Sequence, residues 1–193
     1  MKPYKLSFSG LHSYREEQQV DFRELGHAGI FGVFGPTGGG KSTILDAVTL
    51  SLFGRVERAK NGTRGILNQH ETRLMVFLEF GLGDDCFQVE RVYQRDKNDP
   101  DSLKIKNARL LQISGSTTVL ADKANEVDAR IAALLGMSFD DFSRAVILPQ
   151  GKFDQFLKLT GGDRARMLEN ILRLERYGEV LWKKASKLET SLN

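Results

Sequence analysis

The stretch GPTGGGKST, Gly35–Thr43, directly follows an apolar run and begins a segment with helical periodicity. It matches the pattern G-x-x-x-x-G-K-[S/T] at every fixed position, in the strand-to-helix context that the pattern requires. Glycine lets the backbone N–H groups turn inward around a phosphate, and the N-terminus of the following helix adds further donors. The alternative is a glycine-rich turn that binds nothing. The sequence favours a phosphate-binding loop built from Gly35, Pro36, Thr37, Gly38, Gly39, Gly40, Lys41, Ser42 and Thr43.

Two side chains of this loop carry the expected chemistry. Lys41 would reach the β- and γ-phosphates of a nucleotide, which makes it a candidate catalytic residue. Ser42 would place its hydroxyl on Mg²⁺ and is therefore a candidate metal ligand. The expected cofactors are ATP and Mg²⁺.

The segments around the loop predict its structural setting. The apolar run Gly29–Phe34 predicts a buried strand before the loop. Lys41–Phe53 has apolar residues at helical spacing, and Gly54 is a plausible stop. Arg55–Asn68 is basic and rich in Gly, Asn and Thr, which predicts a loop.

The rest of the chain divides into a strand-rich part and a helical part. Further strands are expected at Tyr4–Phe8, Val20–Phe22, Leu74–Phe80, Cys86–Tyr93 and Ile105–Ile113, with a turn at Asn98–Asp101. Helices are expected at Ala121–Leu135, from Phe139, and from an N-cap at Asp163 to the end of the chain. The last of these carries apolar residues at coiled-coil spacing from Leu174 to Leu192, although a single amphipathic surface helix remains the alternative.

Composition narrows the class of protein. The 193 residues are 40% hydrophobic and 27% charged, and only one is a cysteine, so an internal disulfide framework is excluded. No apolar run approaches the ~20 residues of a membrane span, and no secretory signal is visible, so we expect a cytoplasmic protein. Three histidines and one cysteine do not assemble a metal cluster or a Ser-His-Asp site, so nuclease chemistry is not expected in this chain. The net charge of +3 is compatible with a nucleic-acid partner.

A second motif refines the phosphate loop. The stretch VILPQGKF, Val146–Phe153, is a short apolar run that ends at Gln150 before a glycine. A neutral amide at this point can ligate Mg²⁺ or hold an attacking water without adding charge, as the glutamine of a Q-loop does. The alternative is that Gln150 is an ordinary loop residue. We assign Gln150 as a candidate catalytic, nucleotide-contacting and metal-contacting residue.

Three stretches together resemble one family. GPTGGGKSTILDA, LPQGKFDQFLKLTGGDRARMLENIL and the N-terminal GLHSYREEQQVDF look like the N-terminal ATPase segment of the SbcC family, bacterial ABC-type ATPases related to SMC proteins. The resemblance covers essentially the whole chain, and the Q-loop stretch is its most discriminating part. It implies an α/β fold of the P-loop NTPase class. This is an ABC-type head with mixed and antiparallel strands, the P-loop helix, a helical part and the start of a coiled coil.

The resemblance also implies further site residues. His12 and Ser13 would lie beside the phosphates, and Asn61, Gly62, Thr63 and Arg64 near the base and ribose. Relatives outside the bacterial branch often have an arginine at the position of His12. The phosphate contact would then come from backbone groups and Ser13, and His12 would be an ordinary surface histidine.

The implied organisation places residues 1–175 in the head and 176–193 in a coiled coil. In this family a C-terminal segment of the same protein completes the head, and two heads enclose two ATP molecules. An SbcD-type nuclease binds near the coil, and the complex acts on double-stranded DNA in the cytoplasm, at the nucleoid. No membrane partner is implied.

Two catalytic elements are missing from the sequence. A run of four apolar residues followed by Asp-Glu is absent, because Met75–Leu78 is followed by Glu79-Phe80. Ile113–Ser116 only faintly resembles a signature loop and is interpreted as a turn. We therefore expect half of a catalytic site, which does not turn ATP over alone. An SMC-type DNA clamp without a nuclease remains the alternative function.

The segment Arg55–Arg64 contains four basic residues whose partners the sequence leaves open. They could meet phosphates of nucleotide or DNA, or form a solvated basic loop. The four residues are Arg55, Arg58, Lys60 and Arg64.

Overall fold

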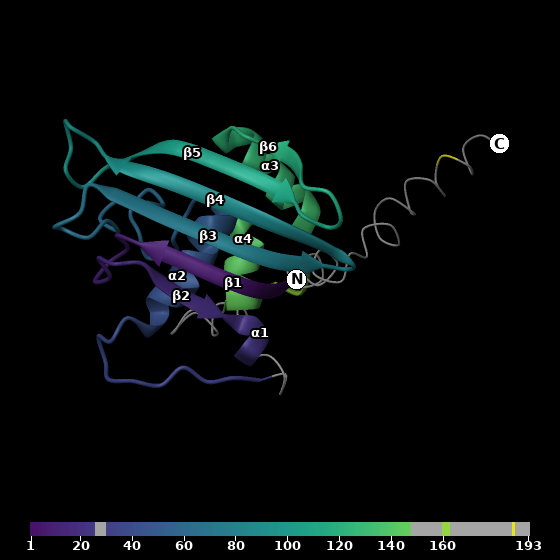
Figure 1. The fold of residues 1–193 in the computed structure, drawn as a ribbon, viewed down its shortest axis with the longest axis horizontal. Helices are drawn as coiled ribbons and strands as arrows, with labels where there is room; N and C mark the ends of the chain where they lie inside the picture. Colours follow the sequence, from purple (N-terminus) through teal and green to yellow (C-terminus); the bar gives the residue numbers. More distant parts are fainter. Residues whose placement is uncertain (26–29, 148–159, 163–186, 188–193) are drawn as a thin grey trace. The chain divides into compact units, whose positions relative to one another are not determined.

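The computed structural model describes residues 1–25, 30–147, 160–162 and 187, and Figure 1 shows their course. The chain forms two compact units, Met1–Ile131 and Ala132–Asn193. The predictions for Gln150, for the N-cap Asp163 and for the coiled-coil boundary at 175 lie outside the described residues.

The first unit is built on a six-stranded sheet in the order β2-β1-β3-β4-β5-β6. All five neighbouring pairs are antiparallel. The strands are β1 Lys2–Ser9, β2 Gln18–Asp21, β3 Arg73–Leu82, β4 Asp85–Arg95, β5 Leu103–Gln112 and β6 Thr118–Ala121. The predicted strands around Tyr4–Phe8, Val20–Phe22, Leu74–Phe80, Cys86–Tyr93 and Ile105–Ile113 are thus confirmed, with small shifts at their ends.

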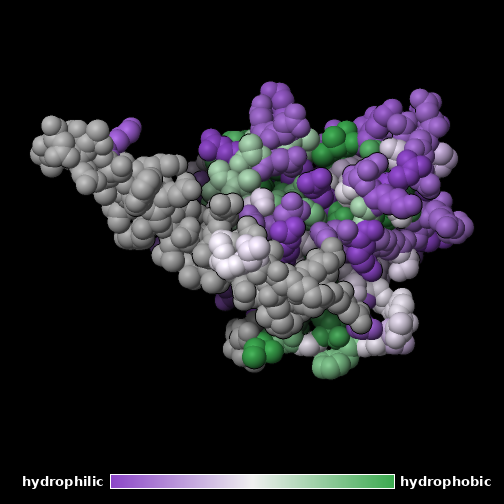
Figure 2. Space-filling view, turned by 180° about the vertical axis from the view of Figure 1, so that it is seen from behind, coloured by the Kyte–Doolittle hydropathy of each residue, from purple (hydrophilic) through white to green (hydrophobic). Residues whose placement is uncertain are grey.

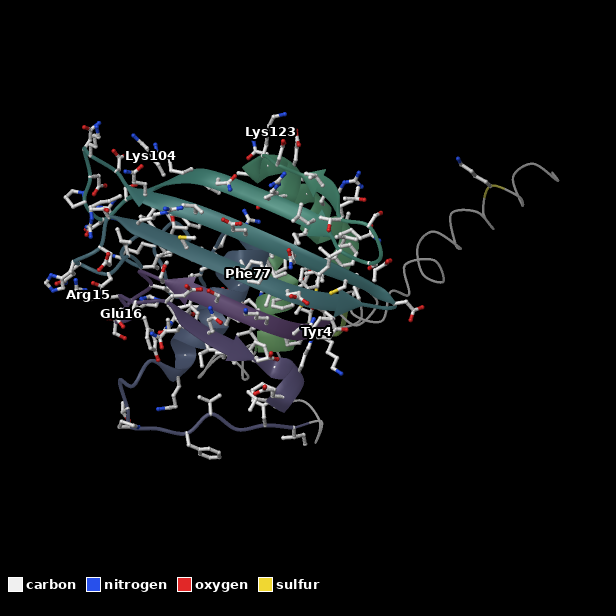
Figure 3. The ribbon with its side chains drawn as sticks, in the orientation of Figure 1. Tyr4, Arg15, Glu16, Phe77, Lys104 and Lys123 are labelled. Carbon is white, nitrogen blue, oxygen red and sulfur yellow. The ribbon has the colours of Figure 1, made fainter. Side chains whose placement is uncertain are left out.

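The core of this unit lies on one face of the sheet. Leu6 and Phe8 of β1 and Leu74, Val76 and Leu78 of β3 alternate with less buried residues, and each of the five is at most 2% exposed. The helix α2, Lys41–Phe53, packs against β1, β3 and β4, and Figure 1 shows it behind the sheet. No described helix covers the opposite face, and Phe77 lies near its centre (Figure 3).

Most helices of the described residues are short. Besides α2 they are α1 Phe22–Leu25, α3 Ala124–Leu135, α4 Phe139–Phe142 and the π-helical turn η2 Ser143–Ile147. The helix α4 begins with a capping box, in which the Ser138 hydroxyl accepts from the backbone N–H of Asp141. No helix within the described ranges is long and apolar enough to cross a membrane.

The predicted buried strand Gly29–Phe34 is wrong for the residues that the structure describes. Residues 30–34 belong to no strand, and Ile30 and Phe34 are 86% and 93% exposed. In Figure 1 the segment from 30 to 40 runs clear of the sheet, and Figure 2 shows hydrophobic atoms along this lower edge. An apolar run becomes a buried strand only when neighbouring strands satisfy its backbone groups, and none of the six strands pairs with it. Among the described residues, the strands therefore form one antiparallel sheet.

The start of the helix expected at Ala121–Leu135 also needs correction. Residues Thr118–Ala121 form the edge strand β6, paired with β5, and α3 begins only at Ala124. The helical period of the pattern is correct, since Val127 and Ile131 are fully buried. The turn interpretation of the segment at Ser114 is confirmed, because β5 ends at Gln112 and Gly115 adopts a left-handed φ of 78°.

Candidate nucleotide-binding site

The glycine loop leads directly into the N-terminus of α2. Gly38 and Gly40 have φ values of 82° and 78°, in the left-handed region that favours glycine. Gly40 is the N-cap of α2, and no side chain caps the helix there. The first turn of α2 also contains no acidic residue. An uncapped helix N-terminus of this kind presents N–H donors and the positive end of the helix dipole to an anion.

The Lys41 ammonium lies over the loop. Its Nζ donates hydrogen bonds to the carbonyl oxygens of Gly35 and Pro36, at 2.8 and 2.7 Å. The neighbouring Ser42 is exposed, whereas Thr43 is buried and its N–H donates to the Gly40 carbonyl at 2.9 Å. A cation, an exposed hydroxyl and a helix N-terminus without a side-chain cap therefore meet at one place. This donor set fits the phosphates of a nucleotide and a hydrated Mg²⁺.

Tyr14 is a loop contact that sequence reasoning missed. Its hydroxyl donates to the Gly39 carbonyl at 3.3 Å, and its ring packs edge-on against Phe8 of β1. A Cβ at Gly40 would lie 2.5 Å from Tyr14 atoms, so Tyr14 also closes the space beside this glycine. The only sequence signal was an aromatic residue close to His12 in the β1–β2 connection.

The structure directs His12 toward α2. Its Nε2 lies 3.1 Å from Oδ2 of Asp46, which is only 7% exposed. The His12 backbone has a left-handed φ of 52° and is held by its N–H bond to the Ile66 carbonyl, at 2.7 Å. Ser13 is exposed. His12 is thus not an unpartnered surface histidine, and a phosphate contact from His12 or Ser13 stays a prediction.

The segment Arg55–Arg64 is a compact loop whose arginines are partly neutralised within the unit. Arg58 pairs with Asp46, and Arg64 pairs with Asp99. The Arg64 guanidinium holds the pKa of the Asp99 carboxyl below its usual range. Arg58 and Arg64 thus have carboxylate partners within this unit, and whether the basic residues of the loop meet phosphates stays open.

The residues predicted to contact the base and ribose form the turn of the same loop. Asn61 and Gly62 both have left-handed φ values, 52° and 80°. The Arg64 N–H donates to the Lys60 carbonyl at 2.9 Å, and the Gly62 carbonyl accepts from the Val56 N–H at 2.7 Å. The turn Asn61, Gly62, Thr63 and Arg64 is therefore well formed, and its contact with a nucleotide remains a prediction.

Comparison with known proteins places this chain in a family. Residues 5–193 match the AAA domain family. The chain is 52% identical over 198 residues to the SbcC component of the nuclease SbcCD from Bacillus subtilis (strain 168), covering 100% of this chain and 17% of that protein. It is 42% identical to the SbcC component of the nuclease SbcCD from Clostridium acetobutylicum, over 94% of this chain and 16% of that protein.

A third relative carries a different name. The chain is 35% identical to a probable DNA double-strand break repair Rad50 ATPase of Aquifex aeolicus, over 93% of this chain and 17% of that protein. The chain therefore spans about a sixth of the length of these relatives, and it matches their N-terminal segment. By its sequence and its phosphate loop, the chain belongs to the AAA domain family of P-loop ATPases, within the group formed by SbcC-type and Rad50-like proteins.

Proposed function

We propose that this chain is the N-terminal part of an ATP-binding head that gates a DNA-processing nuclease. The observation that carries the proposal is the glycine loop Gly35–Gly40 at the uncapped N-terminus of α2, with the Lys41 ammonium over it. Relatives named as components of a nuclease favour this function over an SMC-type clamp without a nuclease.

In this proposal the chain's own residues hold Mg·ATP from one side. The N–H groups at the start of α2 and the Lys41 ammonium bind the β- and γ-phosphates, and the Ser42 hydroxyl orients the metal. For Lys41, the two carbonyl bonds that it makes with the loop would be exchanged for bonds to phosphate oxygens. Bound Mg²⁺ would neutralise charge on the phosphates. Gln150 would contact the metal from its own loop.

The remaining parts of the site would come from elsewhere. We propose that the water-activating Glu lies in a C-terminal segment of the same protein, and that the signature loop comes from a second head. The exposed apolar run from Ile30 to Phe34 supports this, because it offers apolar side chains and a backbone that pairs with none of the six described strands. In such a complex the run would become the buried strand that its sequence predicts.

ATP-dependent closure of two heads would then move the coiled coil and the nuclease bound near it. A ligand shifts such an equilibrium only through its different affinity for the two states, and ATP would favour the closed one. We propose an SbcD-type nuclease, double-stranded DNA and a second head as partners, in the cytoplasm at the nucleoid. The names of the relatives, a nuclease component and a DNA double-strand break repair ATPase, support these partners.

The test is the affinity for Mg·ATP of the full-length protein and of its Lys41→Ala variant. We expect Lys41→Ala to weaken binding by about a hundredfold or more, because a charged hydrogen-bond donor to the phosphates is lost. Lys123→Ala is the matched control, since this exposed lysine pairs only with the nearby Glu126 among the described residues. Equal affinities of Lys41→Ala and the control would remove the phosphate-loop assignment.

A second experiment tests the half-site. The chain of residues 1–193 is expected to show no normal ATP turnover by itself and to gain turnover when the C-terminal segment is supplied. Turnover at normal rates by the chain alone would contradict the composite site.

A further inference from the structure

Asp46 is a buried carboxylate in the middle of the P-loop helix. It is the only acidic residue of α2 and is 7% exposed. It follows Ser42 by four positions, and this spacing places both residues on one face of the helix. A buried charge is tolerated only where partners compensate its lost hydration. The partners of Asp46 therefore show why an acid is kept at this position.

Two described side chains bond to the Asp46 carboxylate, and both come from segments outside the helix. His12 Nε2, from the β1–β2 connection, lies 3.1 Å from Oδ2, and the Arg58 guanidinium donates to the same oxygen. Arg58 lies in the loop whose turn at Asn61–Arg64 is expected near the base and ribose. One carboxylate oxygen therefore ties two separate loops to the helix that carries Lys41 and Ser42.

Other bonds of the loop join it to places other than Asp46. At its far end Arg64 pairs with Asp99, in the β4–β5 connection. The loop's internal hydrogen bonds, such as Val56 N–H to the Gly62 carbonyl at 2.7 Å, fix its own shape. The bond between Arg58 and Asp46 joins the middle of this loop to α2 through a buried carboxylate.

We propose that Asp46 is a positioning residue of the nucleotide site. By holding Arg58, Asp46 fixes the position of the loop Arg55–Arg64 relative to the phosphate loop. The base, ribose and phosphates of one ATP can then be bound together. The inference rests on the proposed function, because it assumes that α2 binds the phosphates of ATP. It goes beyond that function because it gives Asp46 a role in binding the base and ribose of ATP. Asp46 has this role without contacting the phosphates.

The test compares two ligands in the full-length protein by calorimetry. Mg·ATP contains base and ribose, whereas Mg·tripolyphosphate contains only the phosphate chain. We expect Asp46→Asn to weaken Mg·ATP binding by about tenfold, the effect of one charge-assisted hydrogen bond, and to leave Mg·tripolyphosphate binding unchanged. Asp96→Asn is the matched control, because Asp96 pairs with Lys104 at 3.0 Å in the β4–β5 region. The control is expected to change neither affinity.

Unchanged Mg·ATP affinity in Asp46→Asn would overturn the inference. An equal loss for both ligands would also overturn it, because Asp46 would then support the phosphate cradle itself. Arg58→Gln keeps the His12–Asp46 contact and is expected to reproduce the loss that is selective for ATP. It serves as the test if Asp46→Asn does not fold. Lys41→Ala separates the two hypotheses, since it should abolish binding of both ligands. If Lys41→Ala kept its affinity for both ligands, the proposed function itself would be wrong, whatever the result for Asp46→Asn.

Discussion

The two ends of α2 differ in how their unpaired backbone groups are satisfied. At the N-terminal end, Gly40 offers no side-chain cap, and the loop before it is exposed. At the C-terminal end, the buried Arg91 of β4, 1% exposed, donates to the Ser51 and Leu52 carbonyls at 2.8 Å each. Gly54 adds its own N–H bond to the Leu50 carbonyl at 3.0 Å.

This difference separates a binding end from an anchored end. Every helix leaves unpaired N–H groups at its start and unpaired carbonyls at its end. Here a guanidinium paired with Asp128 at 2.7 Å satisfies the carbonyls from within the protein. At the other end no side chain caps the N–H groups, which leaves that end open to a ligand. A helix fixed at one end can present its other end to phosphates without reorganisation, which is the condition for strong anion binding.

Arg91→Met tests the anchored end and has the largest expected effect on stability. The Ser51 and Leu52 carbonyls would lose charged donors in a buried place, so the free energy of opening of α2 should fall by about 3 kcal/mol. The measurement is hydrogen exchange of peptides covering residues 50–56 in the full-length protein. Asp128→Asn leaves the guanidinium in place and should have a smaller effect. Unchanged exchange in Arg91→Met would contradict the anchoring role.

Gly40→Ala and Gly38→Ala form a matched pair at the binding end. Both glycines have left-handed φ values, and alanine there costs about 1–2 kcal/mol. A Cβ at Gly40 would also meet Tyr14 at 2.5 Å, whereas one at Gly38 has nothing within 4 Å. We expect Gly40→Ala to weaken Mg·ATP binding by about tenfold or more, and Gly38→Ala by less. Equal losses would show that Tyr14 does not support the loop.

Gly54→Ala tests whether the anchored end is independent of binding. Gly54 has a φ of 66°, and a Cβ would lie 3.0 Å from Arg91 Nη1. The substitution should lower the opening free energy of α2 by about 1 kcal/mol and leave the Mg·ATP affinity of the folded protein unchanged. A loss of affinity as large as that of Gly40→Ala would remove the distinction between the two ends.

Tyr93→Phe has the smallest expected effect at neutral pH. Burial raises the pKa of Tyr93 to about 12. The ordinary pKa is about 10, so the stabilisation of the folded state is complete below pH 10 and is lost as the pH rises through 12. Wild-type stability should therefore fall over this range more steeply than that of Tyr93→Phe. If the stability of the wild type and of Tyr93→Phe fell equally over this pH range, the raised pKa of Tyr93 would be contradicted.

The sequence was informative wherever the deciding contacts are local. The bounds of α2 follow from Lys41 and Gly54, because the helix starts after a glycine loop and ends at a left-handed glycine. The phosphate loop could be predicted from the sequence for the same reason, since its residues are consecutive. Tyr14 and Asp46 were missed because their contacts join residues 25 and 34 positions apart, which no local pattern encodes.

The apolar run from Ile30 to Phe34 shows why strand prediction failed there. Its composition predicts burial, but a strand needs a partner that the described residues do not supply. The edge strand β6 was missed for the opposite reason. Its four residues are too few to show a period and are recognised only through their pairing with β5.

Hydrogen exchange with and without Mg·ATP tests the phosphate-site assignment most directly, because it reads both ends of α2 in one experiment on the full-length protein. We predict strong protection of peptides covering residues 35–43 when Mg·ATP is added. Peptides covering residues 50–56 should already be protected and change little. No added protection at residues 35–43, or protection confined to residues 50–56, would contradict the assignment of the open end of α2 as the phosphate site.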